Sequence, residues 1–139
     1  MMLKAELRKE YLQKRKAISA AEKNKLEDLI LIQFQKLGLQ IPEKLLSYMP
    51  MDHNNEYDPF LVEEFCSFKN PDLQSSYTKI TEDFSNLKCI EVTDETEFEI
   101  NKWGIAEPIS GNSIAINEIE MLFIPLLCFD KEGFRVGYG

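Results

Sequence analysis

Residues 121–139 read MLFIPLLCFDKEGFRVGYG and carry the strongest structural signal of the sequence. The run 121–129 is the most apolar of the chain and predicts a central strand, with Pro125 marking an irregularity or a break. The DKEG sequence at 130–133 predicts a turn, and residues 134–136 should return beside the strand. The final RVGYG can turn tightly and direct backbone N–H groups at an anion.

Helices and strands alternate in the sequence upstream of this stretch. Residues 3–18 are rich in Ala, Leu, Glu, Lys and Arg, and they predict a helix with an apolar stripe. A Ser-x-x-Glu capping box starts a second helix that should end near Gly38. The other predicted elements are strands at 44–49, 74–80 and 87–92, a helix from 60 to about 68 after Asp58 and Pro59, and a loop at 102–108. This alternation predicts one α/β domain with a mainly parallel sheet, whose ligands bind at the carboxyl ends of strands.

Composition limits the possible functions. The 139 residues include 24 acidic and 16 basic side chains, a net charge of −8, which argues against a broad nucleic-acid surface. No apolar run is long enough to span a membrane, and the first residues do not resemble a signal peptide. Cys66, Cys89 and Cys128 are interpreted as reduced core residues of a cytoplasmic protein. His53 is the only histidine, which excludes a metal site built from several imidazoles.

Cationic side chains of the first predicted helix could converge on one anion. Lys4 and Arg8 lie one turn apart and share a face, and Arg15 follows two turns later. A solvated basic face explains this pattern at least as well as a polyphosphate clamp does.

The loop that follows the strand at 44–49 is acidic. Asp52, Glu56 and Asp58 could serve a cation, a substrate amine or acid–base chemistry. Loop solvation and helix capping are the simpler explanation, particularly for Asp58. Trp103 is the only tryptophan, and it could anchor its loop or stack on a flat ligand. The glycine spacing of RVGYG matches neither a Walker A loop nor a dinucleotide fingerprint, so these residues suggest only an anion-binding turn.

Four segments in a fixed order resemble one known family. They are KAELR at 4–8, NEYDP at 55–59, WGIAEP at 103–108 and LFIPLLCFDKEGFRVGYG at 122–139. Together they resemble the 5-formyltetrahydrofolate cyclo-ligase (5,10-methenyltetrahydrofolate synthetase) family over essentially the whole chain. Two departures stand out: Pro59 occupies a position where threonine is common, and the family's glycine-rich loop continues beyond Gly139.

The resemblance implies a fold and an architecture. The expected fold is a three-layer α/β/α arrangement with a mainly parallel sheet, of the NagB/RpiA-like kind. Residues 1–139 would form a single α/β domain that ends within the glycine-rich phosphate loop, with the last strands missing. The 139-residue chain by itself is therefore expected to be inactive.

The resemblance also implies a reaction and its ligands. The family uses ATP to convert 5-formyltetrahydrofolate to 5,10-methenyltetrahydrofolate, releasing ADP and phosphate, with Mg²⁺ as a further cofactor. The alternatives are a non-catalytic folate- or nucleotide-binding remnant and a generic α/β interaction domain. We expect a cytoplasmic monomer that acts on a small molecule and binds neither nucleic acid nor membrane.

Site residues follow from the same resemblance. Catalytic roles are expected for Glu56 and Arg135. The residues expected to bind ATP are Lys4, Arg8, Arg135, Val136, Gly137, Tyr138 and Gly139. Those expected to bind the folate are Arg8, Met51, Glu56, Asp58 and Trp103. No metal ligand is expected within the chain, because ATP oxygens would carry most of the Mg²⁺ coordination.

Overall fold

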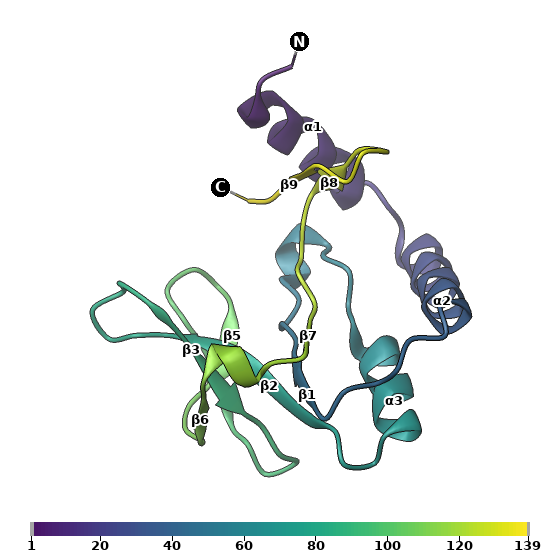
Figure 1. Ribbon diagram of the computed structural model, residues 1–139. Coiled ribbons are helices and arrows are strands. Elements are labelled where there is room, and N and C mark those ends of the chain that lie inside the picture. The colour runs from purple at the N-terminus through teal and green to yellow at the C-terminus, as the bar shows by residue number, and fades with distance from the viewer. Residues whose placement is uncertain (1, 139) are drawn as a thin grey trace.

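The structure is a computed structural model that describes residues 2–138. Its first helix lies against the C-terminal hairpin, whereas the second and third helices lie beside each other next to the central sheet (Figure 1). The helices are α1 (Lys4–Lys16), α2 (Ala20–Lys36) and α3 (Phe60–Lys69), with short 3₁₀ turns η1 (Asp52–Asn54) and η2 (Ile116–Glu118). The strands are β1 (Lys44–Leu46), β2 (Gln74–Ile80), β3 (Leu87–Glu91), β4 (Phe98–Ile100), β5 (Ala106–Pro108), β6 (Ser113–Ile114), β7 (Met121–Leu122), β8 (Cys128–Phe129) and β9 (Arg135–Val136).

The central sheet confirms the predicted α/β class. Its described strands follow the order β6-β3-β2-β1-β7. Strand β1 pairs in parallel with both β2 and β7, whereas β3 pairs antiparallel with β2 and with β6. Four of these five strands therefore run in the same direction, and β3 alone is reversed. Outside this sheet, β4 pairs with β5 and β8 pairs with β9.

The two faces of β1 have different neighbours. Leu46 points to the face that carries a small apolar core with Cys89 and Ile114. Leu45 and Ser47 point to the opposite face, as alternation along a strand requires. Helix α3 covers that face, because its Glu63 side chain accepts a hydrogen bond from Ser47. The carboxyl end of β1 therefore lies between α3 on one face and the small apolar core on the other.

The stretch 121–129 departs from its prediction. It forms no central strand: β7 covers Met121–Leu122 at one edge of the described sheet, and β8 begins only at Cys128. Pro125 supplies no N–H and restricts the backbone of the residue before it, so the apolar run is divided in two. The predicted break at Pro125 is confirmed. The turn after β8 is confirmed as well, since the Gly133 N–H donates to the Asp130 carbonyl at 3.2 Å.

Helix α1 lies along the C-terminal hairpin formed by β8 and β9 (Figure 1). The predicted apolar stripe forms its inner face only in part, since Leu7 and Ile18 are partly buried whereas Leu3 and Tyr11 are exposed. The partly buried side chains include Arg8, Leu12 and Arg15, which share one face. The reason is that the neighbouring segments present carbonyl and hydroxyl oxygens, which need cationic donors more than apolar surface.

The other predictions for single elements and for the cysteines are confirmed in some cases and wrong in others. Helix α2 begins after Ser19, whose hydroxyl accepts the Glu22 N–H at 3.2 Å, and strand β2 spans the predicted residues. The predicted loop at 102–108 is wrong in part, because β5 occupies its second half and pairs with β4. Cys66 and Cys89 are buried as expected, whereas Cys128 is only half-buried. No helix within residues 2–138 combines the length and the apolar character that crossing a membrane demands.

Candidate functional site

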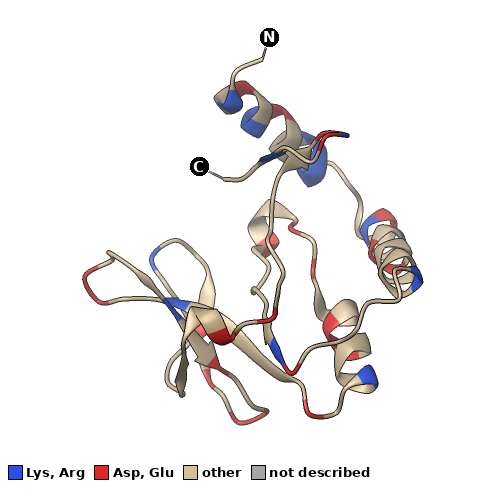
Figure 2. Ribbon diagram, viewed as in Figure 1, with Lys and Arg blue, Asp and Glu red and all other residues tan. Residues whose placement is uncertain are grey.

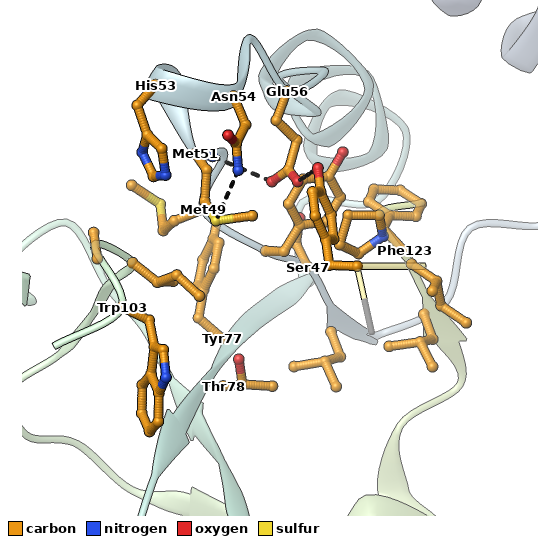
Figure 3. Close-up of a pocket in the computed structure, with 18 residues that line it drawn as sticks. Ser47, Met49, Met51, His53, Asn54, Glu56, Tyr77, Thr78, Trp103 and Phe123 are labelled. Atoms are coloured by element: carbon orange, nitrogen blue, oxygen red, sulfur yellow. Dashed lines mark hydrogen bonds between the residues drawn. The ribbon is translucent and has the colours of Figure 1, made fainter. Parts of the chain in front are cut away.

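A cavity of about 580 Å³ opens at the carboxyl ends of β1 and β7. Residues that follow these strands form one wall, and the η1 loop, the β4–β5 loop and β2 form the others. In Figure 3, Glu56, Asn54 and Met51 point into the cavity from the η1 side, and Trp103 lies on the opposite side. The lining residues are Leu46, Ser47, Tyr48, Met49, Met51, His53, Asn54, Glu56, Tyr77, Thr78, Trp103, Ile105, Ala106, Leu122, Phe123, Ile124, Pro125 and Tyr138. The cavity thus has mostly apolar walls and one buried carboxylate.

Glu56 is that carboxylate, and its side chain is 2% exposed. Its Oε1 accepts the Met51 N–H at 3.2 Å, and its Oε2 accepts the Tyr138 hydroxyl. The chain reverses just before Glu56, where Asn55 has the left-handed φ of 51° that asparagine tolerates better than most residues. This reversal brings the carboxylate back over Met51. Two donors therefore fix a charged group that would otherwise be costly to bury.

The predicted nucleotide residues gather at the end of the molecule where α1 meets β9. Arg8 Nε donates to the Gly137 carbonyl at 3.0 Å. Lys4 lies one turn earlier on α1 and is exposed, and Arg135 is exposed on β9. Val136 pairs with Cys128 in the β8–β9 hairpin. Figure 2 shows more Lys and Arg than Asp and Glu segments along α1, whereas basic and acidic segments are balanced on the adjoining hairpin, so α1 gives this end a local excess of positive charge despite the net charge of −8.

Gly137 faces open space at this end. A Cβ added to Gly137 would meet no heavy atom within 4 Å. Packing of the described residues therefore does not require glycine at this position. Open space beside a backbone amide is what the close approach of a phosphate group needs. The predicted ligand Gly139 lies outside the described residues.

Four of the five predicted folate residues divide between two cavities, whereas the fifth, Arg8, lines neither of them and contacts Gly137 instead. Met51, Glu56 and Trp103 line the cavity described above, together with Tyr138. Trp103 is 47% exposed, and its ring stands edge-on to Phe84 with the centroids 5.5 Å apart. The structure does not bring Asp58 into this cavity. Asp58 lines a neighbouring cavity of about 590 Å³, and its Oδ1 accepts the Phe60 N–H at 3.0 Å at the start of α3.

Several lining residues have roles that the sequence did not indicate. Glu63 of α3 accepts hydrogen bonds from Ser47 and from the Tyr77 hydroxyl, the latter at 2.7 Å. Burial raises the pKa of Glu63, and nearby Asp58 raises it further, whereas the two hydroxyls lower it. Burial also raises the pKa of Tyr77, so its hydroxyl remains a donor. No spacing rule could have found this group, because its members come from the residue after β1, from β2 and from α3.

Arg15 is a second residue whose importance the sequence did not indicate. Its guanidinium donates to groups on three separate segments, including the Tyr138 hydroxyl. Arg15 lies seven residues after Arg8, two turns along the helix. The sequence therefore predicts that both side chains project from the same face of α1. Its partners could not be predicted, because they depend on how the C-terminal residues return to α1.

These features define a class of protein. It is an α/β protein with a small-molecule cavity at the carboxyl ends of parallel strands and a cationic helix beside a glycine-containing segment. The family model described as 5-formyltetrahydrofolate cyclo-ligase matches residues 1–139. The chain therefore belongs to the 5-formyltetrahydrofolate cyclo-ligase family, a family of enzymes.

Relatives of known sequence carry the same family name. A 5-formyltetrahydrofolate cyclo-ligase from Mycoplasma pneumoniae is 29% identical over 140 residues, which cover 99% of this chain and 73% of that protein. One from Haemophilus influenzae is 43% identical over 47 residues, which cover 32% of this chain. That shorter alignment spans only 25% of the Haemophilus protein's length.

Solved structures agree with the fold. The 5,10-methenyltetrahydrofolate synthetase from Aquifex aeolicus, determined by NMR, is similar with a TM-score of 0.80 and 25% identity. The enzyme of that name from Mycoplasma pneumoniae gives a TM-score of 0.73 and 26% identity. Each similarity covers 99% of this chain, and 68% and 73% of the respective solved chains.

Proposed function

We propose that this protein converts 5-formyltetrahydrofolate to 5,10-methenyltetrahydrofolate with ATP, releasing ADP and phosphate. Family membership supports the reaction class. One observation carries the assignment of the site: the consecutive residues Gly137 and Tyr138 contact Arg8 and Glu56 respectively. Two consecutive residues thus connect the two parts of the site. Gly137 belongs to the cationic α1–β9 end, and Tyr138 reaches the cavity with the buried carboxylate.

The cavity suits the folate. Its volume of about 580 Å³ lies within the range of small-molecule sites, and its walls combine apolar side chains with one carboxylate. An ionised carboxylate accepts hydrogen bonds only, so Glu56 suits the N–H groups of a pterin ring. Met51 and Trp103 offer polarisable and aromatic surface for the same flat ring. In this proposal Asp58 supports the cavity indirectly, by capping α3.

The α1–β9 end suits the triphosphate. Lys4, Arg8 and Arg135 supply positive charge, and the backbone amide of Gly137 supplies a donor beside open space. Within residues 2–138, no group of three or more His, Cys, Asp and Glu side chains could hold a metal ion. The proposed Mg²⁺ would therefore be carried mainly by the triphosphate oxygens, which is its usual arrangement in nucleotide sites.

The chemical difficulty is the formamide carbonyl, a poor electrophile because its nitrogen donates electrons into it. ATP held at the α1–β9 end would supply a phosphoryl group to the formyl oxygen, which would make that oxygen a leaving group. N10 of the folate then forms a bond to the formyl carbon and loses its proton, while the C–O bond breaks toward phosphate. Glu56, which lines the cavity, would accept an N–H proton or hydrogen bond, and Arg135 would neutralise phosphoryl charge. Orientation within one folate molecule favours the closure.

Turnover of the full-length product of this reading frame tests the proposal. Incubation with 5-formyltetrahydrofolate, ATP and Mg²⁺ should give the near-ultraviolet absorbance of 5,10-methenyltetrahydrofolate, and omission of ATP should abolish it. A folded protein that forms no product refutes the enzymatic proposal. Binding of folate or nucleotide without turnover would instead support the non-catalytic alternative.

The nucleotide end can be tested by one matched pair of variants. Arg8→Ala removes the cation that contacts Gly137, whereas Lys9→Ala removes an exposed cation from the next position of α1. We predict that Arg8→Ala raises the KM for ATP by about tenfold or more, since a charge-assisted hydrogen bond contributes roughly 1.5–3 kcal/mol. Lys9→Ala should change it less than about twofold. Lys4→Ala and Arg135→Ala should raise the KM for ATP as Arg8→Ala does. An equal effect of Lys9→Ala would show that these cations act as ordinary surface charge and not as a specific phosphate site.

The cellular setting is also proposed. We infer a cytoplasmic monomer that binds neither nucleic acid nor membrane. The net charge of −8 disfavours nucleic acid, and the unpaired thiols of Cys66, Cys89 and Cys128 are compatible with a reducing compartment.

A further inference from the structure

Arg15 uses its whole guanidinium group to join three segments. Its Nε donates to the Asn54 carbonyl at 2.9 Å and its Nη1 to the Leu126 carbonyl at 3.3 Å, while Nη2 donates to the Tyr138 hydroxyl. These partners lie in η1, between β7 and β8, and after β9. The segments are distant in sequence, so the planar donor group fixes their relative positions at one point.

The Tyr138 hydroxyl relays this constraint to the cavity. Arginine can only donate, so the phenol oxygen accepts from Arg15 and its own proton is left for Glu56. Burial, and to a lesser degree the bond to Glu56, raise the pKa of the Tyr138 phenol to about 12 despite the opposing effect of Arg15. The phenol therefore remains a donor at neutral pH, and the order Arg15 to Tyr138 to Glu56 has a fixed direction.

We infer that Arg15 is a positioning residue that acts through Tyr138 to orient the Glu56 carboxylate in the folate cavity. This inference rests on the proposed function, because it assigns Arg15 to the folate end of that site. The neighbouring Gly137 carbonyl is bound by Arg8, so the two arginines fix consecutive residues from the same face of α1. Arg8 belongs to the nucleotide end and Arg15 to the folate end.

The proposed role of Arg15 depends on the planar geometry of its guanidinium group and not on its charge alone. A lysine at position 15 would preserve the positive charge but present one ammonium group in place of a planar fork with three nitrogens. It could not reach acceptors on all three segments at once. Arg15→Lys should therefore weaken folate binding. If the role of Arg15 were purely electrostatic, lysine would keep folate binding at the wild-type affinity.

Folate affinity can be followed without turnover. Trp103 is the only tryptophan and lines the cavity, so quenching of its fluorescence by 5-formyltetrahydrofolate in the absence of ATP reports on binding. We expect Arg15→Gln, Arg15→Lys and Tyr138→Phe each to weaken this binding by about tenfold, the cost of one hydrogen bond to a charged group. Lys16→Gln, an exposed neighbour on α1, serves as the matched control and should leave binding unchanged.

The double variant Arg15→Gln/Tyr138→Phe separates positioning from general support of the fold. If Arg15 acts through Tyr138, the double variant should bind folate no more weakly than the weaker single variant. Multiplied losses in the double variant, or wild-type affinity in Arg15→Lys, would overturn the inference. Tyr138→Phe leaves the guanidinium in place, so it remains informative if Arg15 variants fold poorly, and wild-type folate affinity in it would also overturn the inference.

Failure of this inference and failure of the proposed function give different results. Wild-type protein that binds folate as tightly as its Arg15 and Tyr138 variants contradicts the positioning role alone. Wild-type protein that binds no folate contradicts the proposed function, and the role of Arg15 falls with it.

Discussion

Glu63 is a carboxyl group that the fold has withdrawn from water and bound to two hydroxyls. Ser47 and Tyr77 both donate to it; Ser47 directly follows β1, and Tyr77 lies in the neighbouring parallel strand β2. Tyr77 also lines the candidate folate cavity. The position of its ring therefore depends on Glu63, which does not itself line that cavity. An ionised carboxylate loses its hydration when it is buried, and two hydrogen bonds compensate for only part of this loss.

This environment predicts an unusual pH dependence. Burial, followed by nearby Asp58, raises the pKa of Glu63 above its ordinary value of 4.5, against the opposing effect of the two hydroxyls. Between that value and the raised pKa the folded state binds more protons than the unfolded state does. The contribution of Glu63 to the free energy of unfolding therefore falls as pH rises through this window.

Urea unfolding from about pH 4 to about pH 8 measures this contribution. Glu63→Gln cannot ionise, so the difference in stability between wild type and this variant should shift in favour of the variant as pH rises through the window. Glu64→Gln is the matched control, because Glu64 is the exposed neighbour on α3. A difference between wild type and Glu63→Gln that does not change with pH would show that Glu63 titrates normally.

At the scale of elements, the junction between α1 and the loop after η1 depends on Asn55. Its Nδ2 donates to the carbonyls of Arg15 and Ile18, at 2.8 Å and 3.1 Å. Arg15 lies in the last turn of α1 and Ile18 just beyond it, where carbonyls lack the i+4 N–H partner of a continuing helix. Asn55 also has a φ of 51°, a conformation that most side chains avoid. One residue thus caps a helix and reverses the chain before Glu56.

Two substitutions separate these roles. Asn55→Gly keeps the left-handed backbone favourable but loses both side-chain hydrogen bonds, and it should lower the free energy of unfolding by about 1 kcal/mol. Asn55→Ala loses the bonds and also incurs the cost of the left-handed conformation, so its loss should be about 2–3 kcal/mol. Chemical denaturation measures both. Equal losses would mean that the backbone conformation contributes nothing, and the reverse order would contradict the whole assignment.

Elements with local signals were predictable, and those that depend on distant partners were not. Strand β2 and the start of α2 follow from alternation and a capping serine, so sequence and structure agree there. The run 121–129 misled because its apolar content suggested a central strand, whereas Pro125 limits the pairing that it can make. The β4–β5 hairpin was missed because its strands are short and its loop contains Gly104.

The candidate site shows the same division. Arg8, Glu56 and Tyr138 were named from the resemblance, and the structure brings them together with Gly137. Arg15 was noted as a cation of the same helix face, but its acceptors Asn54 and Leu126 are 39 and 111 residues away in sequence. No periodicity within α1 encodes such partners.

At the scale of the whole molecule, the first helix and the last described residues form one unit. Helix α1, the η1 loop and the β8–β9 hairpin meet around Arg8 and Arg15, while the β2–β3 hairpin extends to another side (Figure 1). This unit lacks a large apolar core of its own, because the buried apolar residues lie in the sheet and in α3. Its cohesion depends on polar contacts, and such regions open more readily than a core does.

Amide hydrogen exchange with and without nucleotide tests whether this unit responds as one body. A ligand present at about 100 times its Kd stabilises the binding-competent state by roughly 2.7 kcal/mol. ATP should therefore slow exchange in α1 and in the β8–β9 hairpin together, even though these segments lie at opposite ends of the sequence. The tip of the β2–β3 hairpin, residues 81–86, should exchange at an unchanged rate. Arg8→Ala should lose the protection in both segments, because it removes the contact to Gly137 that links them. Protection confined to the hairpin, with α1 unaffected, would mean that the phosphate groups contact the glycine segment alone and that the cationic face of α1 has no part in nucleotide binding.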